Sequence, residues 1–327
     1  MRLHYVLLVV ALTCLSSKAG AENYPDRPIR IVVPTGPGGA ADIVSRLIAE
    51  RMQKSLQQTI IIENKPGANG NIGATYALSA PADGYTLMMG HIGLMTVNAH
   101  LYANMTLNPL TDFVPVSRTT TYPNLLVVNN DIPVHSTAEL ISYAKTNPTG
   151  IRYSSSGFGS SFHMGFELLK LRAGIDAVHV PYTGTAHALT AVIAGNVETT
   201  FTDVISAAPQ IEARALRGLA ISSRTRAKNL PDVPTVAESG VPGLQDFDVI
   251  GWNGIVVKAG TPTDRIKLLN DHIRQALRVS EVIERISVLG ADVADGTPEE
   301  FGEFMRAEDA KWGGLVAKAG LKSQQGK

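Results

Sequence analysis

The chain has 327 residues, and its 29 Lys and Arg balance its 29 Asp and Glu, so the formal net charge is zero. The length is sufficient for one large or two medium hydrophobic cores. Because the basic residues are scattered and form no stripe, the composition argues against a nucleic-acid-binding surface. Few aromatic residues (6 %), with 30 glycines and 18 prolines, are typical of a loop-rich α/β protein.

The first 21 residues have the pattern of an export signal. Arg2 precedes the apolar run 6–15, which is too short to cross a bilayer, and Ala19 and Ala21 form the small-x-small pattern of a cleavage site. We therefore predict that residues 1–21 are removed. Cys14 is the only cysteine. Its lipidation is the minor alternative, because "ALTC" departs from the usual acylation pattern. Removal of the signal would leave no disulfide, thiol nucleophile or Cys-based metal site.

The next hundred residues alternate between strand-like and helical patterns. A strand is predicted at 29–33, before a helix at 41–56, and further strands are predicted at 59–64 and 85–90. The turn-rich segment 65–71 leads into a short helix. This βαβαβ order predicts a parallel sheet covered by helices.

A second set of alternating elements begins near residue 122. Its strands are predicted at 124–129, 151–155, 177–182, 197–203 and 217–222. A Pro- and Gly-rich span then precedes a strand at 248–257 and two or three helices that end near Lys318. We predict two Rossmann-like lobes joined by two crossovers, with residues 22–121 and 248–327 in the first lobe and 122–247 in the second. A cleft between such lobes is a natural ligand site and hinge.

The segment "GPGGAA" (36–41) matches the dinucleotide fingerprint G-x-G-x-x-[GA], and Glu63 at the end of the next strand could bind a ribose. This match is the strongest indication of an enzyme, a nicotinamide-dependent oxidoreductase. Pro37 within the turn, the exported location and the lack of a hydride-transfer constellation argue against it. The Walker pattern fails because no Lys-Ser/Thr pair follows the glycines.

The general chemistry of this loop remains. Gly38, Gly39 and Ala40 allow close backbone approach, and free N–H groups at a helix start bind anions. Asp42 lies in the first helical turn, where capping is the simpler interpretation.

A similar strand-loop-helix junction occurs in the second set, "YSSSGFGSSFHMGFELL" (153–169). Its candidate anion-binding residues are Ser155, Gly157, Phe158, Gly159, Ser160 and Ser161. A hydrolase would use one of the last two serines with His163, but residues so close on one helix start seldom face each other, and the motif is not G-x-S-x-G. Ser160 and Ser161 as N-caps is the simple alternative. The Phe158 ring either packs beneath the loop or faces the ligand.

Three further residues lie at strand ends. Thr183 and Asp203 stand at strand-to-helix junctions, and His91 ends the third strand on the same edge as Gly38. Asp203 binds ligand or caps its helix. The histidines have no metal-binding spacing, so we expect neither a metal nor a cofactor.

Taken together, these segments resemble a known family. "YPDRPIRIVVPTGPGGAADIVSRLIAERM", "IIENKPGANGNIGA", "ADGYTLMMG", "SSGFGSSFHMGFELL", "VPYTGTAHALTAVIAGNVETTFTDVISAAPQI", "LPDVPTVAESGVPG" and "WNGIVVKAGTP" resemble the periplasmic solute receptors of tripartite tricarboxylate transporters, the Bug proteins. The resemblance covers essentially all of the chain after the export signal.

The resemblance implies a type II-like periplasmic-binding-protein fold that closes on a carboxylate and delivers it to a membrane permease with a large and a small subunit. We expect a periplasmic monomer without enzymatic activity. Phe158 and His91 stand where the family pattern favours small or hydroxylated residues, which leads us to prefer an aromatic dicarboxylate of the terephthalate or phthalate kind. An aliphatic di- or tricarboxylate, or a role as a ligand-loaded sensor for a signalling system, are the alternatives.

Overall fold

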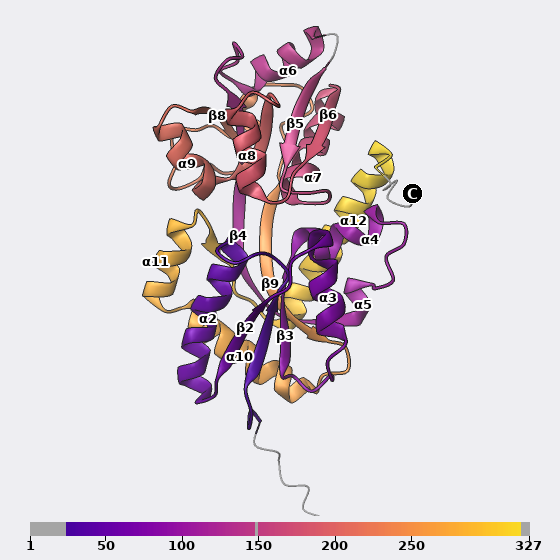
Figure 1. The fold of residues 1–327 in the computed structure, drawn as a ribbon, viewed down its shortest axis with the longest axis vertical. Coiled ribbons are helices and arrows are strands. Elements are labelled where there is room, and N and C mark those ends of the chain that lie inside the picture. The colour runs from indigo at the N-terminus through magenta and orange to yellow at the C-terminus, as the bar shows by residue number, and fades with distance from the viewer. Residues whose placement is uncertain (1–23, 148–149, 322–327) are drawn as a thin grey trace, which may run out of the picture.

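The computed structural model describes residues 24–147 and 150–321. The predicted export signal lies outside these residues. Two α/β lobes are stacked along the long axis of the molecule, and two strands run from one lobe to the other (Figure 1).

The first lobe is built on a parallel three-stranded core. β1 (Ile29–Val33) lies between β2 (Ile60–Asn64) and β3 (Thr86–His91), and both pairs are parallel. α2 (Ala40–Leu56) and α3 (Asn71–Leu78) connect these strands. These predicted strands and helices are confirmed to within one or two residues.

Two long strands join the lobes. β4 (Phe113–Asn129) pairs with β9 (Ile250–Lys258) in the first lobe and continues into the second, where it pairs with β7 and β8. β9 is antiparallel to both β3 and β4. The parallel sheet predicted for the βαβαβ segment is therefore confirmed for β1, β2 and β3, and β9 extends it in the antiparallel direction.

The second lobe repeats the strand-helix alternation. Its strands are β5 (Ile151–Ser155), β6 (Ala177–Pro181), β7 (Thr199–Asp203) and β8 (Leu216–Ile221). Its helices are α6 (Thr137–Thr146), α7 (Ser161–Ala173), α8 (Thr185–Ile193) and α9 (Val204–Glu212). β5 is parallel to both β6 and β7, so the ends of these three strands share one edge of the sheet.

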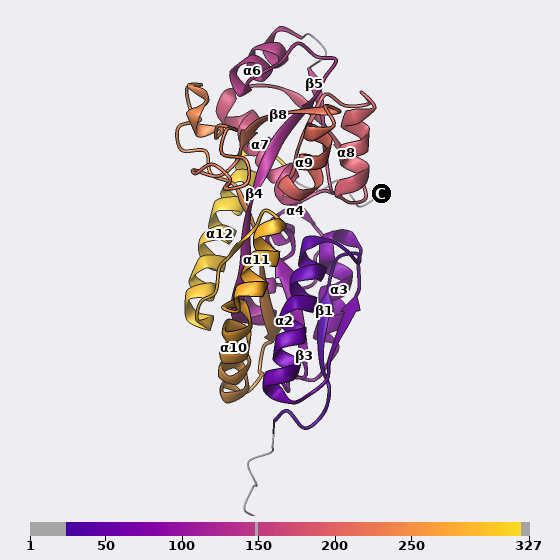
Figure 2. The same cartoon turned by 90° about the vertical axis from the view of Figure 1, so that its left-hand side faces the viewer.

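The remaining elements complete the first lobe (Figure 2). They are a π-helical turn at Gly93–Val97, α4 (Asn98–Leu101), α5 (Pro109–Asp112), α10 (Thr263–Leu277), α11 (Ser280–Val288), β10 (Asp292–Val293) and α12 (Pro298–Ala319). α12 begins with a capping box at Thr297 and Glu300. The prediction of two or three C-terminal helices ending near Lys318 is confirmed.

Close packing holds the crossover strand β9 against α12. Trp252 on β9 is fully buried against the ring of Phe301 on α12, with centroids 5.6 Å apart. A Cβ on Gly254 would come within 2.3 Å of the same Phe301 ring.

We propose that the first lobe comprises residues 22–121 and 248–327 and that the second comprises residues 122–247. Among the described residues, no helix is long and apolar enough to cross a membrane.

Candidate ligand-binding site

The loop between β1 and α2 presents an open helix start in the first lobe. Gly39 is the N-cap of α2, and no side chain caps this end. The first N–H groups of an α-helix have no partner within the helix, so those of α2 face the loop surface. A Cβ on Gly38 would meet no atom within 4 Å, and the nearest atom to one on Gly39 is 3.8 Å away. This end of α2 can therefore accept an anion.

Asp42 braces this loop from within. Its Oδ2 accepts the Gly38 N–H at 2.9 Å and a hydrogen bond from Arg46 Nε at 3.0 Å, and its Oδ1 accepts one from Asn64 Nδ2 at 2.9 Å. Burial opposes ionisation, but the hydrogen bonds from Arg46, Gly38 and Asn64 hold the pKa of Asp42 below its usual value. The carboxylate shapes the loop, and direct contact with a ligand stays a prediction.

The second-lobe loop after β5 is held by its own side chains. Ser155 is fully buried, and its Oγ accepts the Gly157 N–H at 3.2 Å. Gly157 and Gly159 have φ values of +138° and +84°, which favour glycine. Ser160 is the N-cap of α7 and accepts the His163 N–H, as the capping interpretation predicts.

Two other predicted residues in this lobe are also engaged. Ser161 Oγ donates to Asn124 Oδ1 at 3.4 Å. Asp203 is the N-cap of α9 and accepts the Ser206 N–H at 2.8 Å. Burial raises the pKa of Tyr122, and the negative charge of Asp203 adds to this effect. Capping of α9 by Asp203 is confirmed, whereas a contact with ligand is untested.

The start of α8 differs from those of α7 and α9. Gly184 is its N-cap, with no side-chain cap, and Thr183 and Gly184 are exposed. Backbone hydrogen bonds tie this turn to the neighbouring loop, from Tyr182 N to Ser155 O at 3.0 Å and from Gly184 N to Ser156 O at 3.2 Å. The structure thus brings Thr183 together with the loop that carries Gly157 and Phe158.

The two lobes touch where Phe158 and Gly159 meet the first lobe. The rings of Phe158 and Tyr102 lie edge to face, with centroids 6.0 Å apart. A Cβ on Gly159 would lie 2.9 Å from Asn69 Nδ2 and 3.0 Å from Asn98 Oδ1. The Phe158 ring also lies 4.9 Å from the ring of His163, so it packs between groups of the protein. Stacking of this ring on an aromatic ligand remains a prediction.

His91 ends β3, as predicted, and its ring lies next to Gly70. Burial lowers its pKa to about 4. Its Nδ1 accepts the Leu94 N–H at 3.4 Å, and its Nε2 lies 2.9 Å from the position that a Cβ on Gly70 would occupy. His91 is therefore neutral near pH 7, and its ligand contact is untested.

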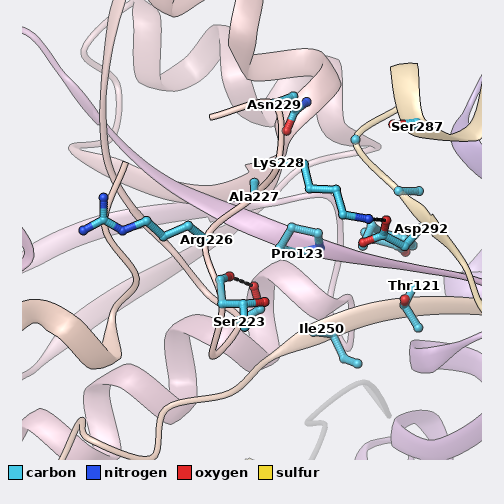
Figure 3. A pocket seen from close by; sticks show the side chains of 14 residues that line it. Thr121, Pro123, Ser223, Arg226, Ala227, Lys228, Asn229, Ile250, Ser287 and Asp292 are labelled. Carbon is cyan, nitrogen blue, oxygen red and sulfur yellow. Dashed lines mark hydrogen bonds and ion pairs between the residues drawn. The ribbon is translucent and has the colours of Figure 1, made fainter. Parts of the chain in front are cut away.

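A separate cavity of about 190 Å³ lies beside the crossover strands (Figure 3). Tyr122 on β4 and Ile250 on β9 contribute to its lining, together with the loop after β8 and the segment before β10. Its charged groups are already paired, Lys228 with Asp292 and Arg226 with Glu238. None of the predicted site residues lines this cavity.

Sequence reasoning missed several residues of this region. Gly184 was not among the predicted ligand-binding residues, although, like Gly39, it is a glycine at the start of a helix. The buried Asn98 was also missed. It donates to Asn69 O and Asn71 Oδ1, and its Oδ1 accepts from Asn69 Nδ2 at 2.8 Å. In the part of the chain that the structure describes, no group of three His, Cys, Asp or Glu residues could hold a metal ion.

Two α/β lobes joined by two crossover strands form the fold of a periplasmic-binding protein. The sequence model of the tripartite tricarboxylate transporter family receptor matches residues 44–321, and the chain belongs to this family. The expected two-lobed fold, the resemblance to Bug receptors and the absence of an enzymatic role are thereby confirmed.

Known relatives cover almost the whole chain. BugT of Bordetella pertussis is 33 % identical, over 96 % of this chain and 96 % of its own. The solved structure of Rpa4515 from R. palustris with adipate is 36 % identical and has a TM-score of 0.83, covering 91 % of this chain and 98 % of its own. MatC (Rpa3494) from Rhodopseudomonas palustris with bound malate is 33 % identical, with a TM-score of 0.81, and covers 90 % and 100 %.

Proposed function

We propose that this receptor captures an organic dicarboxylate between its lobes and presents it to the membrane permease of a tripartite tricarboxylate transporter. The observation that carries the proposal is the pair of helix starts without side-chain caps, α2 in the first lobe and α8 in the second. Each offers unpaired N–H donors and a positive dipole end, which suit a carboxylate. Two such ends on opposite lobes suit a ligand with two carboxylates.

The proposed site combines both lobes. Gly38, Gly39 and Ala40 line the first end, and Asp42 holds that loop in shape. The second end comprises the loop Ser155–Ser161 and the turn at Thr183, with His91 and Asp203 at the strand ends between them. Closure would add the contacts of one carboxylate to those of the other, so binding both ends favours the closed state.

The proposal has two versions, which differ in whether the part of the ligand between its two carboxylates is aliphatic or aromatic. Rpa4515 and MatC, similar in sequence and fold, were solved with adipate and malate, both aliphatic dicarboxylates. The packing of the Phe158 ring against Tyr102 and His163 supports this version. An aromatic dicarboxylate of the terephthalate or phthalate kind is the competing version, and it requires the Phe158 ring or His91 to face the ligand.

Calorimetry with the mature protein tests the proposal. The ligands are adipate, malate, terephthalate and phthalate, with hexanoate and benzoate as matched monocarboxylates. Loss of one carboxylate should weaken binding by about 10- to 100-fold, since hydrogen bonds to a charged group contribute about 1.5–3 kcal/mol. Equal affinity for a mono- and a dicarboxylate of the same body would contradict the two-ended site. Tighter binding of adipate than of terephthalate would favour an aliphatic ligand, and the reverse order would favour an aromatic one.

A further inference from the structure

A column of stacked rings lies directly beneath the second-lobe loop. The rings of His163 and His179 are 4.1 Å apart, and Phe158 and Tyr153 extend the stack on either side at 4.9 Å. His163 is only 1 % exposed. Neither imidazole belongs to the proposed ligand contacts, and both form hydrogen bonds with the loop above them.

Each histidine is bonded to a different part of the loop. His163 Nδ1 accepts the Gly159 N–H at 3.2 Å. His179 Nε2 lies 2.7 Å from Ser155 Oγ, which in turn accepts the Gly157 N–H. The two imidazoles thus hold both glycines of the Gly157–Gly159 turn. His163 bonds directly to Gly159, and His179 acts on Gly157 through the Ser155 hydroxyl.

The bond to Gly159 specifies the protonation of His163. A backbone N–H can only donate, so His163 Nδ1 must carry a lone pair. Protonation of Nδ1 would place two N–H groups against each other and release the turn. Burial, the adjacent His179 and Lys170 all lower the pKa of His163, and burial lowers that of His179 to about 4.

The groups around the column favour the neutral ring. Lys170 on α7 and Tyr153 on β5 both bond to Glu167 Oε1, at 2.8 and 2.5 Å, so the carboxylate is already engaged. Tyr102, from the first lobe, meets the Phe158 end. With Glu167 paired and Lys170 nearby, no partner among these groups would stabilise an imidazolium.

We propose that His163 is a positioning residue of the receptor, whose unprotonated Nδ1 fixes the Gly157–Gly159 turn in the conformation that binds solute. The inference rests on the proposed function, because the turn belongs to the second end of the proposed site. It adds that solute affinity depends on a ring that does not touch the solute and that binding weakens when this ring is protonated.

Two substitutions distinguish the hydrogen-bond acceptor of His163 from the packing of its ring. His163→Asn keeps an acceptor at the Nδ1 position and loses the titrating ring, whereas His163→Phe keeps the ring and loses the acceptor. We expect H163N to retain affinity for the best dicarboxylate within about threefold and H163F to lose at least about tenfold. His272→Asn, at a histidine bonded to Ser55 in the first lobe, is the remote control. Equal losses in H163N and H163F, at matched thermal stability, would overturn the proposal.

A pH series gives a readout that packing alone would not move. The ratio of wild-type to H163N affinity cancels ionisation of the ligand. We expect it to be constant near pH 7, where the ring is neutral, and to fall once the pH is low enough to protonate His163, whose pKa is lowered by burial, His179 and Lys170. A ratio that stays constant while nitrogen NMR of the wild type shows His163 becoming protonated would contradict the proposal.

Nitrogen NMR of the unliganded wild-type protein tests the tautomer without any variant. An unprotonated Nδ1 of His163 at pH 7 is the expected result, and a protonated Nδ1 overturns the inference even if the variants fail to fold. Failure of the wild type to bind any dicarboxylate would instead refute the proposed function, and the NMR result would still decide the state of His163.

Discussion

Phe158 of the second lobe and Tyr102 of the first meet edge to face, with ring centroids 6.0 Å apart and planes at 87°. Phe158 is also adjacent to the Gly159 turn, which touches Asn69 and Asn98 of the first lobe. The aromatic pair is therefore part of the contact between lobes. Such a pair contributes about 0.5–1.5 kcal/mol beyond its buried area.

Replacing Phe158 with Thr should weaken binding of aliphatic and aromatic dicarboxylates by the same factor, about two- to tenfold, because the ring supports closure for every ligand. Calorimetry of the variant with adipate and terephthalate measures the two factors. Tyr102→Phe keeps the edge-to-face contact and loses only the long hydrogen bond from the Tyr102 hydroxyl to Phe158 O at 3.5 Å, so it is the matched control, and its affinity should fall less than that of the Phe158 variant. A selectively larger loss for terephthalate would show instead that the ring stacks on the ligand.

Gly159→Ala should reduce dicarboxylate affinity at least about tenfold. The backbone at this position has a φ of +84°, which a Cβ disfavours, and the added methyl group would lie within 3.1 Å of Asn69, Asn98 and Leu101, so it holds the lobes apart. Gly174→Ala is the matched control, because Gly174 has a φ of +61° and open space around its Cβ position. Both variants should lose about 1–2 kcal/mol of stability from backbone strain. Only the first should lose affinity, and a similar affinity loss in both would exclude the steric explanation.

Gly39→Asp should raise the stability of the unliganded protein by a few tenths of a kcal/mol while reducing ligand affinity at least about tenfold. The new carboxylate would cap α2, which has no side-chain cap, and would occupy the N–H groups proposed for the ligand. Gly39→Ala fits the extended φ of −76° and adds no acceptor, so it should bind nearly as the wild type does. Thermal unfolding and calorimetry on the same samples provide the comparison. Unchanged affinity in the Asp variant would remove the start of α2 from the site.

Asp42→Asn should destabilise the protein by about 1–3 kcal/mol at pH 7, because it removes the buried negative charge that bonds to Arg46 and to the Gly38 N–H. The folded pKa of Asp42 is lowered, so the unfolded state binds more protons in the window between the two pKa values. The stabilisation is therefore present above the usual pKa near 3.8 and is lost as the pH falls through the lowered value.

Thermal unfolding of the wild type and D42N across pH 2–7 measures this difference. It should be constant above about pH 5 and shrink on acidification. Glu50→Gln removes an exposed pair with Lys54 on the same helix and should leave stability nearly unchanged across this pH range. A difference between wild type and D42N that does not shrink as Asp42 becomes protonated would assign the effect to packing and not to charge.

The sequence determined the local order of the molecule. Apolar periodicity and Gly- and Pro-rich turns located β1 to β3, β5 to β8, α2 and the C-terminal helices, because these patterns depend on neighbours along the chain. The same local rules identified Ser160 and Asp203 as possible N-caps, and the structure confirms both. The order of motifs across the chain indicated the receptor family.

Tertiary structure decided what the side chains are free to do. The length of β4 and the antiparallel direction of β9 depend on pairing between strands more than 100 residues apart, which no local pattern encodes. The same holds for Phe158: its position between two glycines is local, whereas its neighbours Tyr102 and His163 come from another lobe and from the next helix. The proposal that the open starts of α2 and α8 form one site likewise depends on tertiary structure, because they belong to different lobes that β4 and β9 connect.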